Sequence, residues 1–241
     1  WHAGGIAVGI EGNGQLRIED GATVAVAGVS TQVGLSRIGS TGRLTLNDGT
    51  FTMGLTQPFD NRGIVEGDGL FTVQTLNNSQ NGQILVGEDD LLRISGSLNT
   101  PQTGRVEIIG GELEIGAAFT NSSAGRVIGE GATLRVRGGN GFTNSGVVTV
   151  LGEENRIFGA VTNNGGSMTA AGNSELTFFN KVQNHGTIKA SAGATITMLD
   201  TLSGDGVTGP GTVFLEGGVS PGRSPGVMNF GGNVTLGDLS E

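Results

Sequence analysis

A group of charged residues in the second half of the chain is of the kind that cleaves polysaccharides. Glycan-cleaving sites need an arginine or lysine base beside acids, or two carboxylates about 5–9.5 Å apart. The residues that meet this requirement, if the fold gathers them, are Arg135, Arg137, Arg156 and Glu153. Long loops usually build the cleft around such a site, whereas the turns in this sequence are short and uniform. We therefore expect no enzyme, and a polysaccharide lyase or hydrolase is the alternative.

The two histidines of the chain do not suggest a catalytic centre. His2 lies near the start of the sequence, and His185 occupies a turn in which other repeats carry Arg62 or Asn164. Neither a Ser-His-Asp arrangement nor a metal triad can be assembled around them. The sequence thus predicts no catalytic residues and no site for an organic cofactor.

Acidic residues recur after a turn in the middle of the repeats. They are Asp68, Glu88, Asp89, Asp90, Glu130, Glu153 and Glu154. Stacked carboxylates repel one another unless they are solvated or bind a cation, and calcium takes about six to eight oxygen ligands. The best candidate for a calcium site is the run Glu88, Asp89 and Asp90. The glycine-rich calcium-binding nonapeptide is absent, because residues 138–141 lack its aspartate. We expect solvated turns, with calcium as the alternative.

These residues are carried by a repeat with a step of about 20 residues, which is typical of a solenoid. The step is marked by glycines, a residue type that makes up 47 of the 241 positions. The repeated glycines are Gly63, Gly82, Gly104, Gly125, Gly146, Gly165, Gly186 and Gly206. We expect them to supply the positive φ angles of tight turns.

A second column of residues, mostly asparagine, precedes the glycines. Its members are Asn61, Asn78, Thr100, Asn121, Asn144, Asn163, Asn184 and Gly204. Asparagine suits a turn because it tolerates the left-handed region and bonds its own backbone. If coils stack at the spacing of β-strands, the amides of this column can hydrogen-bond from coil to coil. We expect a structural ladder made by Asn61, Asn78, Asn121, Asn144, Asn163 and Asn184; the alternative is a row that binds a ligand.

Between the glycines, apolar residues alternate with polar ones, as in Val106-Glu107-Ile108. Such alternation puts one side of a short strand inward, and no stretch has a helical period. Three short strands per repeat predict an all-β, right-handed, single-stranded parallel β-helix of about 20 residues per coil. Residues 1–241 would form one domain: N-terminal repeats in 1–58, regular coils in 59–206, and irregular coils in 207–241 with the loop SPGRSPG. Outward charges at Arg93, Glu114 and Arg135 alternate along a solvated face.

The composition limits the partners. The net charge of −9 disfavours nucleic acid and anionic membranes. Cysteine is absent, which excludes disulfides and thiolate zinc sites. No apolar run approaches the length of about 18 residues that a spanning helix needs, so we expect no membrane insertion by this segment.

Several stretches resemble the repeats of known surface proteins. Residues 142–150 (FTNSGVVTV), 182–190 (VQNHGTIKA) and 131–136 (GATLRV) resemble the β-strand repeats of bacterial autotransporter passengers. Similar repeats occur in large surface proteins that carry the PEP-CTERM sorting signal, and residues 8–24 resemble a repeat shared by both groups. Residues 211–226 resemble an SPG-containing element found late in such passengers.

This resemblance implies display outside the cell, as a secreted or surface-attached stalk, and it brings no catalytic residues. We expect an exported structural or adhesive protein, extracellular or on the bacterial cell surface; a glycan-binding or glycan-cleaving β-helix is the alternative. Residues 234–237 still read as a strand, and no polar cap is evident in residues 1–5 or 238–241. Open coils template further pairing. The expected partners are therefore other copies of the chain, stacked end to end, or surface glycans.

Overall fold

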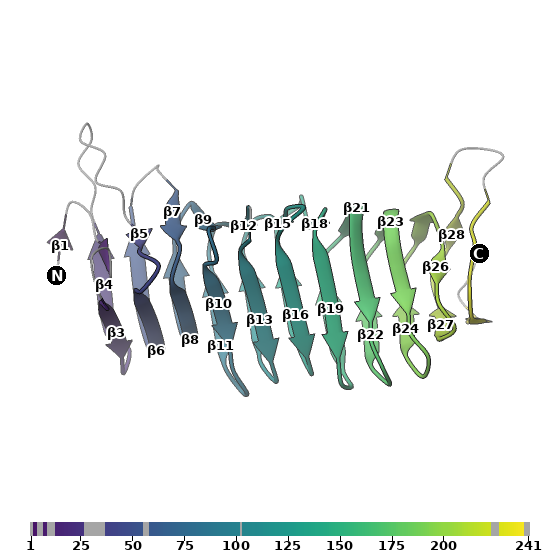
Figure 1. The fold of residues 1–241 in the computed structure, drawn as a ribbon, viewed down its shortest axis with the longest axis horizontal. Helices are drawn as coiled ribbons and strands as arrows, with labels where there is room; N and C mark the ends of the chain where they lie inside the picture. The colour runs from purple at the N-terminus through teal and green to yellow at the C-terminus, as the bar shows by residue number, and fades with distance from the viewer. Residues whose placement is uncertain are drawn as a thin grey trace.

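The alternating strands wind the chain into flat coils that stack along one axis (Figure 1). The computed structural model describes residues 2–3, 7–8, 13–26, 37–54, 58–101, 103–222 and 227–238. The N-terminal strands lie at one end of the stack and the C-terminal strands at the other. Every pairing between described strands is parallel. The predicted parallel β-solenoid is confirmed, and the described residues contain no helix.

The strands fall into three columns, one for each side of the coil. The first column, here called the asparagine face, contains β2 (Ala7–Val8), β5 (Arg37–Ile38), β7 (Phe59–Asn61), β9 (Thr75–Asn78), β12 (Ser97–Thr100), β15 (Phe119–Asn121), β18 (Phe142–Asn144), the first parts of β21 (Val161–Ala170) and β23 (Val182–Ala190), β25 (Leu202–Gly204) and β28 (Val219–Ser220). From β5 to β28 the chain makes about nine turns of about 21 residues.

The other two columns close the coil. The second face contains β3 (Gln15–Glu19), the first parts of β6 (Arg43–Met53) and β8 (Ile64–Thr72), β10 (Gln83–Val86), β13 (Arg105–Ile109), β16 (Arg126–Glu130), β19 (Val147–Leu151), the second parts of β21 and β23, and β26 (Val207–Thr208). The third face contains β1 (His2–Ala3), β4 (Thr23–Val26), the second parts of β6 and β8, β11 (Leu91–Ile94), β14 (Glu112–Ile115), β17 (Thr133–Val136), β20 (Asn155–Phe158), β22 (Glu175–Phe178), β24 (Thr195–Met198), β27 (Thr212–Leu215) and β29 (Asn233–Leu236).

The core is a column of apolar side chains from all three faces. Strand positions alternate between buried and half-buried, so every second residue points inward. Aromatic rings lie on top of one another where successive coils both carry phenylalanine. Phe119 and Phe142 stack with ring centroids 4.7 Å apart, and Phe51 and Phe71 with centroids 4.8 Å apart. Where successive coils carry the same residue at one position, the fold therefore packs like side chains against each other.

The repeated glycines are required by the close approach of neighbouring coils. A Cβ atom on Gly104 would lie 1.9 Å from the carbonyl oxygen of Asn78, and one on Gly63 would lie 2.2 Å from the carbonyl oxygen of Gly42. Among the eight predicted glycines, only Gly165 has a positive φ. None of the ladder asparagines has one either. The expectation of positive φ angles at these columns was wrong. The positive φ angles of the turn between Asn78 and Gly82 belong to Gln80 and Asn81, and the constraint on the glycines comes from the adjacent coil.

In the coil formed by β21, Gly166 takes the repeat position instead of Gly165. A Cβ atom on Gly166 would lie 2.4 Å from Nδ2 of Asn144, whereas nothing lies within 4 Å of one on Gly165. Gly165, with a φ of 73°, lies in a register irregularity between Asn164 and Ser167. The coil thus contains one extra residue, which a count of sequence spacing cannot place. Of the SPGRSPG loop, residues 220–222 are described and 223–226 lie outside the described residues.

Candidate functional site

The asparagines of the predicted ladder lie inside the asparagine face and bond from coil to coil. Nδ2 of Asn121 donates to Oδ1 of Asn144 at 2.8 Å, and Nδ2 of Asn144 donates to Oδ1 of Asn163 at 2.9 Å. The next amide continues the row, from Asn163 to Asn184 at 2.8 Å. Backbone groups make the remaining hydrogen bonds of these amides; for example, the N–H of Gly146 donates to Oδ1 of Asn144 at 3.2 Å. All the amides of the row are fully buried.

The ladder has one interruption and a defined end. Nδ2 of Asn78 donates to the backbone oxygen of Arg105 at 2.7 Å and not to Thr100. The hydroxyl of Thr100 begins the next run by donating to Oδ1 of Asn121 at 2.6 Å. At the other end, Asn184 donates to backbone oxygens of the next coil, since Gly204 has no side chain. Because these amides are buried and satisfied within the protein, they set the coil geometry and are not placed to contact a ligand.

The arginines suggested for glycan cleavage are neutralised by carboxylates on the surface of the third face. Nε of Arg135 lies 2.7 Å from Glu112, and its guanidinium carbon lies 4.0 Å from the centre of the Phe158 ring. Arg137 binds Glu114 at 2.6 Å. Arg93, Glu114 and Arg135 are in register, as predicted. However, Arg135 pairs with Glu112 and not with Glu114, and Glu114 pairs with Arg137.

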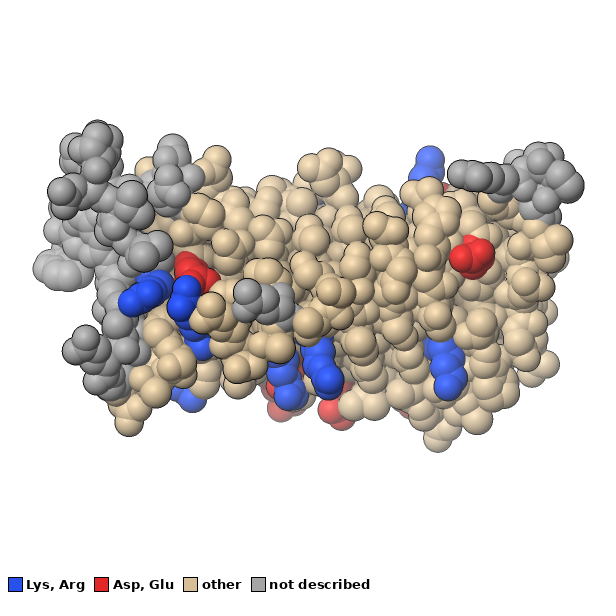
Figure 2. Space-filling model, turned by 45° about the horizontal axis from the view of Figure 1, so that its top comes forward, with Lys and Arg blue, Asp and Glu red and all other residues tan. Residues whose placement is uncertain are grey.

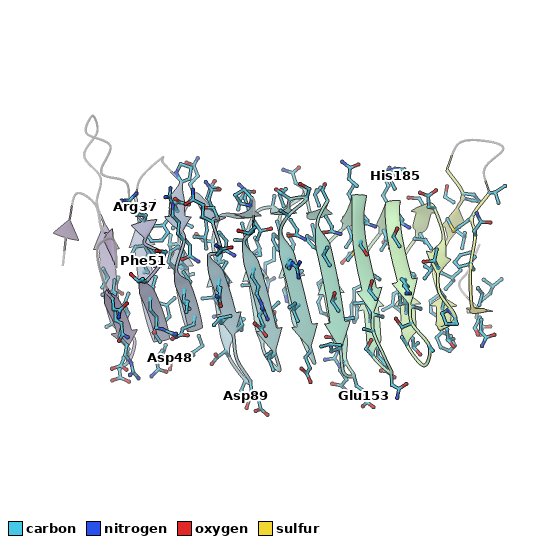
Figure 3. The ribbon with its side chains drawn as sticks, viewed as in Figure 1. Arg37, Asp48, Phe51, Asp89, Glu153 and His185 are labelled. Carbon is cyan, nitrogen blue, oxygen red and sulfur yellow. The ribbon has the colours of Figure 1, made fainter. Side chains whose placement is uncertain are left out.

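The other two residues suggested for glycan cleavage are Arg156 and Glu153. Arg156 lies 3.3 Å from Glu154, its neighbour two residues earlier. Glu153 is exposed and points away from the stack along the edge where Asp89 also projects (Figure 3). The structure therefore distributes the suggested acids and bases between separate ion pairs and a turn.

The electrostatics of Glu114 argue against a role as a general acid. Its hydrogen bond with Arg137 lowers the pKa of the Glu114 carboxyl below its usual value; burial opposes this shift, and the charges of Arg137, Arg93 and Arg135 add to it. A general acid that works near neutral pH needs a raised pKa instead. The ionised carboxylate is therefore engaged in holding Arg137.

Two cavities lined by described residues lie near charged side chains, and neither resembles a sugar-cleaving cleft. One has a volume of about 20 Å³, lies beside Arg156, and is walled by core residues such as Val148 and Ile157. Such a space holds about one water molecule. The other, of about 170 Å³, is lined by Arg37, Gly39, Ser40, Arg62 and Gln80. Its Arg62 is already paired with Asp60 at 2.6 Å.

The acidic turns do not converge on a cation site. Oδ2 of Asp90 accepts a hydrogen bond from the N–H of Gly87 at 3.0 Å, within its own turn. Asp89 has a φ of 62° and projects from the edge of the stack (Figure 3). In the part of the chain that the structure describes, no three acidic, histidine or cysteine side chains are grouped as a metal would require. The calcium candidate Glu88, Asp89 and Asp90 is therefore not assembled.

A half-exposed row of uncharged polar residues was missed by the sequence analysis. It runs over the asparagine face at the position between each buried apolar residue and the ladder, and we call it the outer column. Its members are Asn77, Asn99, Thr120, Thr143, Thr162, Gln183 and Ser203, aligned by strand register. Beyond Asn77 the same register continues with the charged residues Asp60 and Arg37, which are not counted in the column. The sequence feature that could have revealed this row is the polar middle residue of the repeated FTN-type triplet. Figure 2 shows an uncharged area across the upper middle of the molecule.

A buried asparagine outside the ladder was also missed. Asn155 is 2 % exposed and stands at the start of β20. Its Nδ2 donates to the backbone oxygens of Leu151, Gly152 and Glu175, and its Oδ1 accepts from the N–H of Ala132 at 3.2 Å. It closes a turn between the second and third faces, and a single asparagine outside the repeat column gave no sequence signal for this role.

No model of a known protein family matches the chain, and neither the curated proteins nor the solved structures include a match to it. Among the described residues, no helix has the length and apolar character needed to cross a membrane. What the structure establishes is therefore the β-solenoid fold, and no family or homologue identifies the chain as an autotransporter passenger or a PEP-CTERM protein.

Proposed function

We propose that the protein is a structural or adhesive β-solenoid displayed outside a bacterial cell, with no catalytic activity of its own. The resemblance of its repeats to autotransporter passengers and to surface proteins with the PEP-CTERM signal supports this setting. A stack of coils joined by parallel strands and by a buried amide ladder is suited to reach and stiffness. The distribution of its arginines among surface ion pairs supports a structural role for them.

The observation that carries the proposal is the open surface of the coil that ends in β29. Val234 and Leu236 are in register with Val213 and Leu215, which are 1 % and 2 % exposed. In β29 the corresponding side chains are 39 % and 63 % exposed. Among the described strands, β29 pairs only with β27, so its other edge offers backbone N–H and C=O groups. A further coil, from the same chain or a second copy, would bury both features.

We therefore expect the protein to associate end to end through this coil. Sedimentation velocity of the chain at increasing concentration should show larger species, because stacking buries apolar surface and pairs a strand edge. The double variant Val234→Lys/Leu236→Lys should sediment as a monomer over the same range. Leu199→Lys, at a similarly exposed leucine on the side of the stack, is the matched control and should associate like the parent. A parent chain that stays monomeric at all concentrations would count against end-to-end assembly.

We also expect no cleavage of glycans. Incubation of the chain with polygalacturonate, alginate or glucomannan should release neither reducing nor unsaturated ends, because the suggested acids and bases are separated or paired. Release that disappears in Arg135→Ala or Glu153→Gln would show that the polysaccharide lyase or hydrolase alternative is correct.

A further inference from the structure

The outer column contains hydrogen-bonding groups that the protein itself leaves unused. Within the described part of the chain, the hydroxyls of Thr120, Thr143 and Thr162 and the amide of Gln183 make no hydrogen bond. The neighbouring members of the column do bond internally: Asn99 donates to Asn77 at 3.2 Å, and Ser203 donates to a backbone oxygen. The middle of the column is thus a run of partially exposed donors and acceptors on successive coils.

We propose that this part of the outer column binds an extended, uncharged polysaccharide that lies parallel to the long axis of the stack. The inference rests on the proposed function, because it gives the surface-displayed rod its ligand. The contact would be made by the side chains of Asn99, Thr120, Thr143, Thr162 and Gln183.

The chemistry of the column favours an uncharged ligand. Hydroxyl and amide groups donate and accept hydrogen bonds, as sugar hydroxyls do. Along Asn99 to Thr162 an ionic ligand would lose water without meeting an opposite charge in register, since the ion pairs of Arg135 and Arg137 lie on the third face. The charged residues of the asparagine face include Asp60 and Arg37 beyond Asn77, and Lys181 beside Gln183. A folded protein partner would be expected to use buried aromatic or arginine anchors, and the column contains neither.

The geometry favours an extended chain. Successive members of the column are separated by the strand spacing of about 4.8 Å, so the four steps from Asn99 to Gln183 cover about 19 Å. The residues upstream of Thr120, Thr143 and Thr162 are small, with Ala118, Gly141 and Ala160 stacked by backbone hydrogen bonds; the stack continues with the exposed Lys181 beside Gln183. A linear polymer can therefore lie close to the hydroxyls over several of its sugar units.

An aromatic border lies at the corner where the third face meets the asparagine face. Phe158 and Phe179 stack with centroids 4.0 Å apart, and both are half-buried. Phe158 ends β20 and β21 begins at Val161, the residue before Thr162. Phe158 lies between Arg135 and Phe179, and the part of the two side chains that stays exposed offers apolar surface to the C–H groups of a sugar that hydrogen-bonds to the column.

The ladder beneath the column makes the array rigid before a ligand binds. Thr120, Thr143 and Thr162 each precede a ladder asparagine that is hydrogen-bonded to its neighbours. Groups that are already ordered lose little conformational freedom on binding. Each hydrogen bond contributes modestly, so useful affinity must come from repetition along the polymer.

The test is affinity electrophoresis of the whole chain in native gels that contain hydroxyethyl cellulose, glucomannan, laminarin or polygalacturonate. At least one of the three uncharged polymers should retard the protein, and polygalacturonate should not. The triple variant Thr120→Val/Thr143→Val/Thr162→Val keeps the shape of the column and removes its hydroxyls. Its dissociation constant for the retarding polymer should rise by about tenfold or more.

The matched control is Thr133→Val/Thr177→Val/Thr197→Val, which removes hydroxyls from half-buried, outward positions of the third face. It should bind like the parent, and the circular dichroism of both variants should show that they fold. The proposal is overturned if no uncharged polymer retards the chain, if polygalacturonate retards it as strongly, or if both triple variants lose binding equally. Sedimentation separates this outcome from the proposed function, because end-to-end association through β29 does not use the outer column.

Discussion

Replacing Asn144 by leucine is expected to lower the free energy of unfolding by about 3 kcal/mol. Asn144 is fully buried and makes four hydrogen bonds through its side chain, to Asn121, Gly146, Asn163 and Ser167. Leucine has a similar size but leaves the amide donor of Asn121 and the amide oxygen of Asn163 without their ladder partners. Each buried polar group left unpaired costs about 1–3 kcal/mol. Chemical denaturation of the parent and the variant measures the difference.

The matched control for this prediction is Asn164→Leu in the adjacent coil. Asn164 is exposed and its side chain makes no hydrogen bond within the described residues. Its replacement should change the free energy of unfolding by no more than about 0.5 kcal/mol. If both leucine variants unfold at the same denaturant concentration as the parent, the ladder does not stabilise the fold.

Truncating Phe142 to alanine is expected to cost about 3–5 kcal/mol of stability. The ring is fully buried and stacks on Phe119 with an interplanar angle of 19°. Its removal would leave a cavity between coils whose backbones are held at a fixed spacing by parallel hydrogen bonds, so the neighbouring coils cannot collapse into it. Thermal and denaturant-induced unfolding, followed by the β-sheet signal in circular dichroism, would measure the loss.

Phe158→Ala provides the comparison for Phe142→Ala. Phe158 is also stacked on a phenylalanine of the next coil, but it is half-buried and lies on the outside of the stack. Loss of a surface aromatic pair is worth about 0.5–1.5 kcal/mol. Equal destabilisation by the two substitutions would mean that aromatic stacking, and not the filling of the core, accounts for the effect.

The sequence by itself determined the class of fold and the position of the amide column. Period-two alternation is a local property of a strand, and a step of about 20 residues sets like residues above one another once coils stack. Phe142, Thr143 and Asn144 show both effects: the first and third point inward, and the triplet repeats in register with residues 119–121. These conclusions need no knowledge of distant contacts, because the repeat itself defines which residues meet.

Only the tertiary structure decided what the repeat does not encode. Gly104 is required by a carbonyl oxygen of the preceding coil, an approach that no φ preference reveals. The extra residue at Gly165 shifts the register of one coil, and Arg135 selects Glu112 instead of the in-register Glu114 because long side chains reach diagonally across strands. The unused hydroxyls of the outer column likewise emerge only from the whole set of contacts. Whether a polar group finds a hydrogen-bond partner depends on every neighbour that the stacked coils bring to it. Sequence spacing specifies only the neighbours in register on the adjacent coils.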